Sequence, residues 1–109
     1  KRFAVKTSKG IFIINVDDIV FIRAEEGLVF SFIKNQKKFA LNHSLGELEK
    51  ILNPKVFFRL NRGEIVNVNF IEKLENYFND RLSVSLKSFD EKLISSASRT
   101  SALRKWIDT

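Results

Sequence analysis

Short apolar runs separated by polar turns dominate the first third of the chain and predict β-strands. The polar segment Thr7-Ser8-Lys9-Gly10 lies between two such runs, which is the pattern of a β-hairpin. Ala24-Glu25-Glu26-Gly27 lies between the next two, and its glycine is free to adopt the positive φ of a tight turn. These strands are expected at residues 3–6, 11–14, 19–23 and 28–33.

The same pattern returns further along the chain. A turn at residues 35–37 leads into a run at 38–41, and three later runs are separated by Asn79-Asp80 and by Ser88-Phe89-Asp90. We expect those three strands at residues 70–74, 82–86 and 92–95. Eleven phenylalanines, together with isoleucine and valine in short runs, favour a mostly β domain.

Two segments follow a helical period instead. Ser44 and Glu47 have the spacing of a capping box, apolar residues recur at 45, 48, 51 and 52, and Asn53-Pro54 ends that helix. Near the C-terminus, apolar residues at 102, 103, 106 and 107 share one helical face, and Ser98 is the expected N-cap. The whole pattern predicts antiparallel strands with two short helices.

Length and composition limit the possible classes of protein. The 109 residues suffice for one domain with a core that needs no disulfides. The chain has no methionine and begins at Lys1, so we expect residues 1–109 to be a single domain from the C-terminal part of a longer protein. No cysteine is present, which excludes disulfides and thiolate metal sites. No apolar run approaches the roughly 18 residues of a membrane-spanning helix.

The charge of the chain favours an anionic partner. Nineteen basic and thirteen acidic side chains give a net charge of +6, which suits nucleic acid, anionic lipid or an acidic protein. Residues 92–107 contain cations and no acidic residue, whereas acids gather at Asp17-Asp18, Glu25-Glu26 and Glu47. We therefore expect basic ends and edges rather than a uniformly basic surface.

The residue types on which most enzymes rely are scarce. His43 is the only histidine and precedes a helix cap, where a surface or capping role is favoured over a catalytic base. Glu25 and Glu26 are adjacent at a strand end, so their side chains point to opposite sides. Asp17-Asp18 lacks the alternating spacing of a calcium loop. We expect no enzyme, no cofactor and no metal site.

Two arginines lie where local structure presents a cation to a ligand. Arg62 occupies a strand-to-loop corner, and Arg99 lies at the expected start of the last helix, where a cation opposes the helix dipole. A phosphate there satisfies both the arginine and the free N–H groups of the first helical turn. Surface or ion-pair roles stay open for both arginines. Arg59 is expected to hydrogen-bond the backbone, and Asn67 and Asn69 to be structural.

The central residues resemble a known family. Residues 58–71 are similar to the central signature of LytTR DNA-binding domains, Phe-x-Arg-x-His-Arg-Ser-x-x-Val-Asn followed by Ile; they read Phe58-Arg59-Leu60-Asn61-Arg62-Gly63-Glu64-Ile65-Val66-Asn67-Val68-Asn69-Phe70-Ile71. Residues 18–25 resemble the family's Asp-Ile-x-Tyr-Ile-x-Ala strand, residues 44–49 its Ser-Leu-x-Glu-Leu helix, and residues 95–99 its closing Ser-Arg element. Order and spacing hold over nearly the whole chain.

The resemblance implies a fold and a function. The fold is a mostly β domain whose antiparallel strands form three small sheets stacked end to end, with two short helices. The function is sequence-specific binding of double-stranded DNA by loops inserted into successive major grooves. Such domains are the output halves of bacterial response regulators or of membrane-attached regulators. A cytoplasmic location, paired half-sites and an N-terminal receiver or membrane-sensor module are therefore expected, and a homodimer on DNA stays open.

The resemblance also implies a set of DNA-binding residues. They are Gly27, Asn61, Arg62, Gly63, Ser98, Arg99 and Thr100, and we add Lys105 as a phosphate contact. Asn61 replaces the histidine of the signature and Gly63 its serine, although the Gly63 N–H is expected to remain a donor. The acidic first loop repels phosphate. These departures keep open an alternative, a protein-interaction or sensory module of the same fold without DNA binding.

Overall fold

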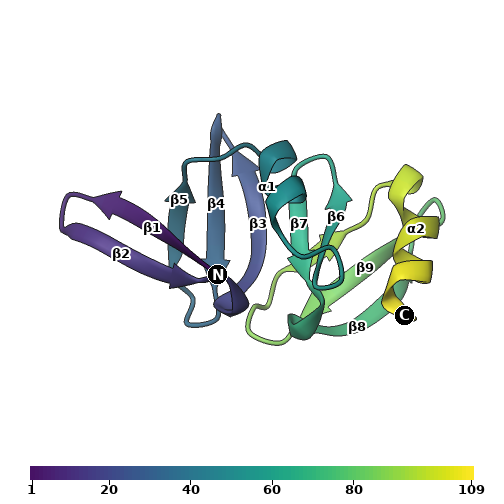
Figure 1. Ribbon diagram of the computed structural model, residues 1–109. Helices are drawn as coiled ribbons and strands as arrows, with labels where there is room; N and C mark the ends of the chain where they lie inside the picture. Colours follow the sequence, from purple (N-terminus) through teal and green to yellow (C-terminus); the bar gives the residue numbers. More distant parts are fainter.

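The computed structural model describes all 109 residues as a row of three antiparallel sheets with principal extents of 44 × 28 × 25 Å (Figure 1). The two-stranded sheet consists of β1 (Arg2–Thr7) and β2 (Gly10–Asn15). The five-stranded sheet, in the order β5-β4-β3-β7-β6, comprises β3 (Ile19–Glu25), β4 (Leu28–Ile33), β5 (Lys38–Leu41), β6 (Phe57–Asn61) and β7 (Glu64–Asn67). The three-stranded sheet, in the order β10-β9-β8, comprises β8 (Ile71–Tyr77), β9 (Arg81–Leu86) and β10 (Lys92–Ile94).

The remaining elements connect the sheets. Helix α1 (Leu45–Ile51) joins β5 to β6, and α2 (Ala97–Ile107) follows β10. Short 3-10 turns at Val16–Asp18 and Val68–Phe70 lead into β3 and β8. The predicted fold class, antiparallel strands in three small sheets with two helices, is confirmed.

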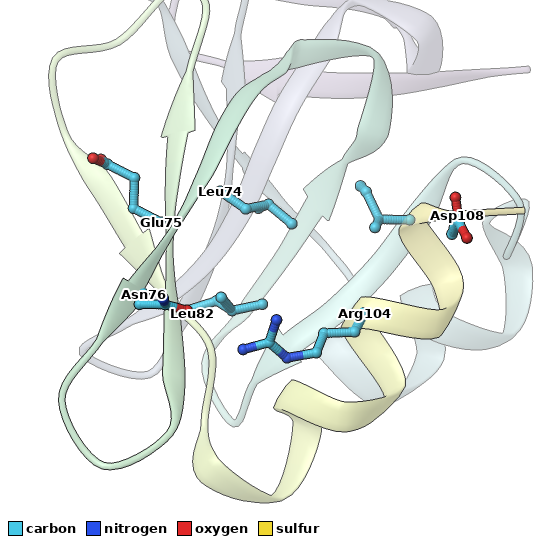
Figure 2. Close-up of a pocket in the computed structure, with 7 residues that line it drawn as sticks. Leu74, Glu75, Asn76, Leu82, Arg104 and Asp108 are labelled. Carbon is cyan, nitrogen blue, oxygen red and sulfur yellow. The ribbon is translucent and has the colours of Figure 1, made fainter.

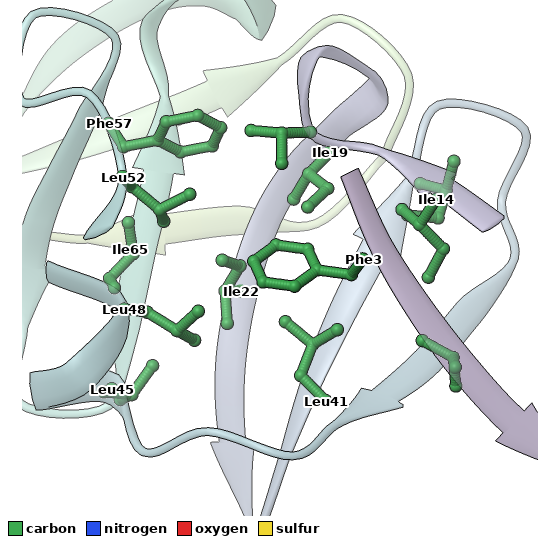
Figure 3. Packing of buried hydrophobic residues seen from close by; sticks show 13 residues of the cluster. Phe3, Ile14, Ile19, Ile22, Leu41, Leu45, Leu48, Leu52, Phe57 and Ile65 are labelled. Carbon is green, nitrogen blue, oxygen red and sulfur yellow. The ribbon is translucent and has the colours of Figure 1, made fainter. Parts of the chain in front are cut away.

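The five-stranded sheet is buried on both faces. Neighbouring residues of a strand point to opposite faces, so Ile22 of β3 joins one hydrophobic cluster and Phe21 joins the other. The first cluster receives Leu48 of α1 and the inner face of β1–β2 (Figure 3). The second receives the three-stranded sheet and Leu103 of α2. Because both faces are covered, β3 is a continuous apolar run at residues 19–22 rather than an alternating one.

Asn67 is a structural residue, as predicted. Its side chain is fully buried, its Nδ2 donates to the Ile19 carbonyl at 2.8 Å, and its Oδ1 accepts from the Asn69 N–H at 2.9 Å. The amide thereby closes the 3-10 turn after β7 and ties it to β3. Asn69 takes part through its backbone only, and its side chain is exposed.

Two predicted boundaries are wrong. Ser96, not Ser98, is the N-cap of α2, because the Ser96 N–H donates to the Leu60 carbonyl at 3.1 Å and turns the chain there. Strand β8 continues to Tyr77, well beyond residue 74, since its polar C-terminal half is exposed yet still pairs with β9.

The β3–β4 connection is also shorter than expected. Glu25 pairs with Leu28, which leaves a two-residue turn at Glu26 and Gly27. Their φ angles are 48° and 83°. Two successive positive φ angles match the right-handed twist of the flanking strands, so the hairpin closes tightly.

We predict that Asn67→Ala lowers the free energy of unfolding by about 1–3 kcal/mol, because the buried Ile19 carbonyl loses its donor. Urea denaturation followed by circular dichroism measures this loss. Asn69→Ala is the matched control and should change stability by less than about 0.5 kcal/mol, since it removes only an exposed amide. Equal losses in both variants would contradict the structural role of Asn67.

A second prediction concerns the capping box of α1, which is present as expected. The Glu47 carboxylate accepts from the Ser44 N–H at 2.8 Å, and this hydrogen bond, followed by that with the Ser44 side chain, lowers the pKa of Glu47. Because the pKa of Glu47 is lower in the folded than in the unfolded protein, its ionised carboxylate stabilises the fold. This stabilisation is fully present above the ordinary glutamate pKa and is lost as the pH falls through the pKa of Glu47 in the folded state.

The measurement compares the wild type with Glu47→Gln, whose amide oxygen accepts the same hydrogen bond but does not titrate. Urea unfolding at pH 7 and at pH 3 should show a larger loss of stability in the wild type than in the variant. If acidification destabilises both proteins equally, Glu47 makes no pH-dependent contribution.

Candidate nucleic-acid interface

Three connections lie along one edge of the molecule, the upper edge in Figure 1. They are the β3–β4 turn, the β6–β7 turn and the N-terminus of α2. The end of β3 adjoins the β6–β7 turn, because the Ala24 N–H donates to the Gly63 carbonyl at 2.9 Å. The start of α2 adjoins β6 through the bond from the Ser96 N–H to the Leu60 carbonyl. The structure thus brings together segments that are far apart in the sequence.

Arg62 occupies the tip of the β6–β7 turn. Its side chain is exposed, and no hydrogen bond or ion pair joins its guanidinium to another residue of the chain. The Arg62 carbonyl, by contrast, accepts a short hydrogen bond from Arg59. The backbone of the turn is therefore held while the cationic group remains free for a ligand.

Arg59 is the scaffold of this turn, as the sequence suggested. Its Nε donates to the Asn61 carbonyl at 2.9 Å, and a second nitrogen donates to the Arg62 carbonyl. Its Nη1 lies 2.8 Å from a carboxylate oxygen of Glu49 on α1. The guanidinium of Arg59 thus connects Asn61 and Arg62 to helix α1.

Asn61 acts inside the protein rather than at its surface. Its Nδ2 donates to Glu64 and to the Ile94 carbonyl, both at 2.8 Å, and its Oδ1 accepts from the Gly63 N–H at 2.8 Å. Both amide hydrogens are thus occupied. The Gly63 N–H is not free either, contrary to expectation, because Asn61 binds it. Asn61 consequently braces the turn against β10.

The Arg99 guanidinium lies over the aromatic ring of Phe58. The guanidinium carbon is 4.5 Å from the ring centroid, and Nε donates to the Arg59 carbonyl at 3.0 Å. A guanidinium on an aromatic face gains cation–π attraction and loses side-chain freedom. Its two terminal NH₂ groups make no hydrogen bond within the chain. Arg99 therefore offers these groups in a fixed direction.

The neighbours of Arg99 divide between solvent and interior. Ser98 is exposed, with its hydroxyl 3.3 Å from that of Ser96. Thr100 is only 5% exposed, its Oγ1 donates to the Ser96 carbonyl, and it lies 2.7 Å from Ser95 Oγ. The Thr100 side chain is therefore unavailable for a surface contact, because helical periodicity turns it toward the core. Lys105 is exposed in the last turn of the same helix, which runs away from the upper edge (Figure 1).

The acidic first loop is partly neutralised, which the sequence did not reveal. Glu25 lies 3.1 Å from Lys38 Nζ on β5 and 3.8 Å from a nitrogen of Arg23. Glu26 is left exposed at the tip beside Gly27. The repulsion expected between this loop and phosphate thus comes mainly from one carboxylate.

Sequence reasoning also missed a charged cluster behind the edge. Arg23 binds Glu64 at 2.7 Å and makes a short contact with Glu91, and its guanidinium lies over Phe21 and Phe32 at 5.0 and 5.6 Å. Burial lowers the pKa of Arg23, but the hydrogen bonds that it donates to Glu91 and Glu64, together with their negative charges, outweigh this effect and raise the pKa overall. The only signal was a lone arginine at the end of an apolar strand.

Outside the edge, His43 was the other residue considered for a functional role. His43 is half-buried, 5.5 Å from the ring of Phe3, and its Nδ1 has no partner, so it is neither a plain surface residue nor a cap. No group of three or more histidines and carboxylates is placed to hold a metal ion. Neither helix has the length and apolar character needed to cross a bilayer.

Comparisons with known proteins bear on this edge. The LytTr DNA-binding domain family matches residues 9–108. An uncharacterized HTH-type transcriptional regulator of Staphylococcus aureus is 46% identical over 66 residues, which are 61% of this chain and 44% of that protein. The sensory transduction protein LytT of Bacillus cereus is 29% identical over 87 residues, 79% of this chain and 35% of that protein. The chain therefore spans less than half the length of these curated relatives.

A solved structure shares the fold. A LytTr DNA-binding domain from Bacillus cereus superposes with a TM-score of 0.89, covering 99% of this chain and 97% of that one at 23% identity. At this level of identity the likeness concerns the fold and not the details of the site.

The two glycines of the edge lead to a third prediction. Gly27 has a φ of +83°, and no atom lies within 4 Å of the position that a Cβ would occupy, so Gly27→Ala should cost about 1 kcal/mol of stability from backbone strain alone. At Gly63, which is not in the left-handed region, a Cβ would lie 3.9 Å from Asn61 Oδ1, an ordinary contact. Gly63→Ala should be nearly neutral. Thermal unfolding of both variants checks the contrast, and a greater loss at Gly63 would refute it.

Proposed function

The chain belongs to the LytTr DNA-binding domain family, and on that premise we propose that it binds duplex DNA sequence-specifically through the edge described above. The observation that carries the proposal is the free, exposed guanidinium of Arg62 on a braced turn, with the fixed guanidinium of Arg99 on the adjoining helix. Arginine on a rigid support is suited to bidentate hydrogen bonding with guanine and to phosphate binding.

The order of the three connections along the edge suits binding across successive grooves. The β3–β4 turn, the β6–β7 turn and the N-terminus of α2 follow one another along the upper edge, and the β1–β2 hairpin extends the molecule beyond them (Figure 1). In this proposal, neighbouring connections contact successive major-groove segments of one duplex. The turns take the place of a recognition helix, since α2 presents its N-terminus rather than its side to the edge (Figure 1).

Each residue of the edge has a distinct role in this proposal. Arg62 reads a base, Arg99 reads a base or binds a phosphate, and Ser98 and the first N–H groups of α2 bind a phosphate. Lys105 adds charge along the backbone of the duplex. Asn61 and Thr100 act from inside by holding these groups in place, and Gly27 keeps the first turn tight.

The relatives support a place for this domain in a longer regulator. One is named a transcriptional regulator and another a sensory transduction protein, and both are more than twice as long as the matched part. We propose that the chain is the output domain of such a protein, joined to an N-terminal receiver or membrane-sensor module. Paired half-sites on DNA would follow when two such proteins bind together.

A protein-interaction module is the second candidate. Ile11 and Ile13 are each 62% exposed on β2, and Glu26 places a negative charge at the tip of the first turn. Contiguous exposed apolar residues mark interaction surfaces. If this candidate is correct, the domain shows no salt-dependent affinity for any DNA duplex.

The fourth prediction separates base reading from charge. After a binding sequence is selected from a random duplex library, Arg62→Lys and Arg62→Ala should each weaken that duplex by about 1–3 kcal/mol and relax the preference at one position. Lysine retains the positive charge of Arg62 but not its planar pair of donors. If Arg62→Lys does not restore affinity for the selected duplex, the contact made by Arg62 is bidentate. Fluorescence anisotropy titrations on selected and scrambled duplexes measure both effects.

Two variants serve as controls. Lys105→Ala should weaken selected and scrambled duplexes alike and reduce the salt dependence, because it removes a phosphate contact. Lys9→Ala, on the β1–β2 turn away from the edge, should leave both affinities nearly unchanged. Full rescue by Arg62→Lys would refute base reading by Arg62, and no binding to any duplex would favour the interaction module.

A further inference from the structure

Strand β8 is an open edge of the three-stranded sheet. It pairs with β9 alone, whereas β9 also pairs with β10. The N–H and carbonyl of Leu82 on β9 both bind Ser95, on the side away from β8. Because backbone groups alternate along an antiparallel pair, Leu74 and Asn76, which lie opposite Val84 and Leu82, direct their N–H and carbonyl groups to the open side.

A groove follows the same edge. It has a volume of about 670 Å³ and lies between β8 and the last turns of α2 (Figure 2). Leu74, Leu82 and Ile107 supply its apolar lining, and Arg104 and Asp108 lie on its helical side. In Figure 2 the Leu74 side chain points toward the helix and that of Glu75 points the other way. The edge thus offers unpaired backbone groups beside an apolar channel.

The sequence of β8 is complementary to itself when it is reversed about Leu74. In an antiparallel pair centred there, Leu74 faces Leu74 and Lys73 faces Glu75. The regular register ends at Lys73, where the bulge begins. The central residue is one whose N–H and carbonyl are directed outward, so the two copies exchange both backbone hydrogen bonds at that position. Register, charge and hydrogen bonding therefore select the same pairing.

We propose that β8 is a homodimer interface, in which the β8 strands of two copies pair antiparallel about Leu74 to form one continuous six-stranded sheet. The contact is isologous, since each pair of facing residues occurs twice. The two Leu74 side chains meet on the groove side and cover the apolar lining. A bulge between Ile71 and Lys73 limits the regular ladder to a few residues. We therefore expect a weak dimer, which forms only as the protein concentration rises.

Charge is what makes a second copy the fitting occupant. Lys73 and Glu75 have side chains that are 61% and 44% exposed, and their charged groups lie 3.6 Å apart within one chain. Across the dimer each also faces the opposite charge of the other copy, in positions without mutual backbone bonds, where side chains approach closest. Hydrogen bonding from Lys92, and then the charge of Lys73, lower the pKa of Glu75 and keep it ionised. Glu72 and Arg104 have no ion-pair partner within one chain.

The interface does not rest on DNA binding. Strand β8 lies on the lower side of Figure 1, whereas the turns proposed to contact DNA lie along the upper edge. Dimerisation can thus be measured without DNA, and the failure of either proposal leaves the other standing.

The fifth prediction uses two charge reversals that are complementary to each other. Lys73→Glu leaves glutamate at both facing positions of each strand, and Glu75→Lys leaves lysine at both, so each variant alone should dimerise about tenfold or more weakly than the wild type. Mixed in equal amounts, the two variants restore both opposite-charge pairs and should form a heterodimer. Sedimentation velocity at low ionic strength over a rising concentration series measures all of these states.

Controls address folding and surface charge. The double variant Lys73→Glu/Glu75→Lys should regain the wild-type affinity, and Lys55→Glu, an exposed reversal outside β8, should leave dimerisation unchanged. Circular dichroism confirms that each variant is folded, since either reversal also removes the contact between Lys73 and Glu75 within one chain, and Glu75→Lys removes that with Lys92. A wild type that stays monomeric throughout, single variants that dimerise normally, or a mixture that does not recover would each overturn the proposal.

Discussion

Burial of the five-stranded sheet on both faces is the constraint on which the rest of the structure depends. Strand β3 contributes Ile22 to one core and Phe21 to the other, so the two outer sheets are anchored to the same central strand. A two-stranded hairpin such as β1–β2 is marginal by itself, and here it gains stability by covering one face. Packing of Leu103 on the other face fixes α2, whose N-terminus then falls at the same edge as the β3–β4 and β6–β7 turns.

The candidate interface depends on hydrogen bonds that Arg59 and Asn61 make within the protein. Arg59 holds the corner of the β6–β7 turn to α1, and Asn61 connects that turn to β10 just before α2 begins. A turn with both ends held in this way presents its outward side chain with little backbone freedom. Preorganisation of this kind matters because binding otherwise includes the cost of ordering a loop. The site therefore needs residues that position it as well as residues that are free to touch a ligand.

Net charge alone says little about where an anion binds. Arg23 and Arg59 are occupied by Glu64, Glu91 and Glu49, whereas Arg62 has no partner. The acidic first turn is less repulsive than its composition implies because Lys38 neutralises Glu25. What distinguishes Arg62 is that its unpaired guanidinium lies on a turn whose backbone is held by Arg59. The same reasoning applies to β8, where charges of both signs alternate along an open strand.

Sequence patterns predicted most of the strands and hairpins, the capping box of α1, the structural roles of Arg59 and Asn67, and the family. These features follow from periodicity and turn chemistry within a few residues, which is the range over which sequence patterns are informative. Tertiary structure decided that Ser96 caps α2, that Thr100 faces inward, and that Asn61 braces a turn instead of extending from it. These outcomes depend on partners distant in sequence: Asn61 binds a carbonyl 33 residues away, and Arg99 binds one 40 residues away. No local pattern encodes such a neighbour, because only the stacking of the three sheets brings it within reach.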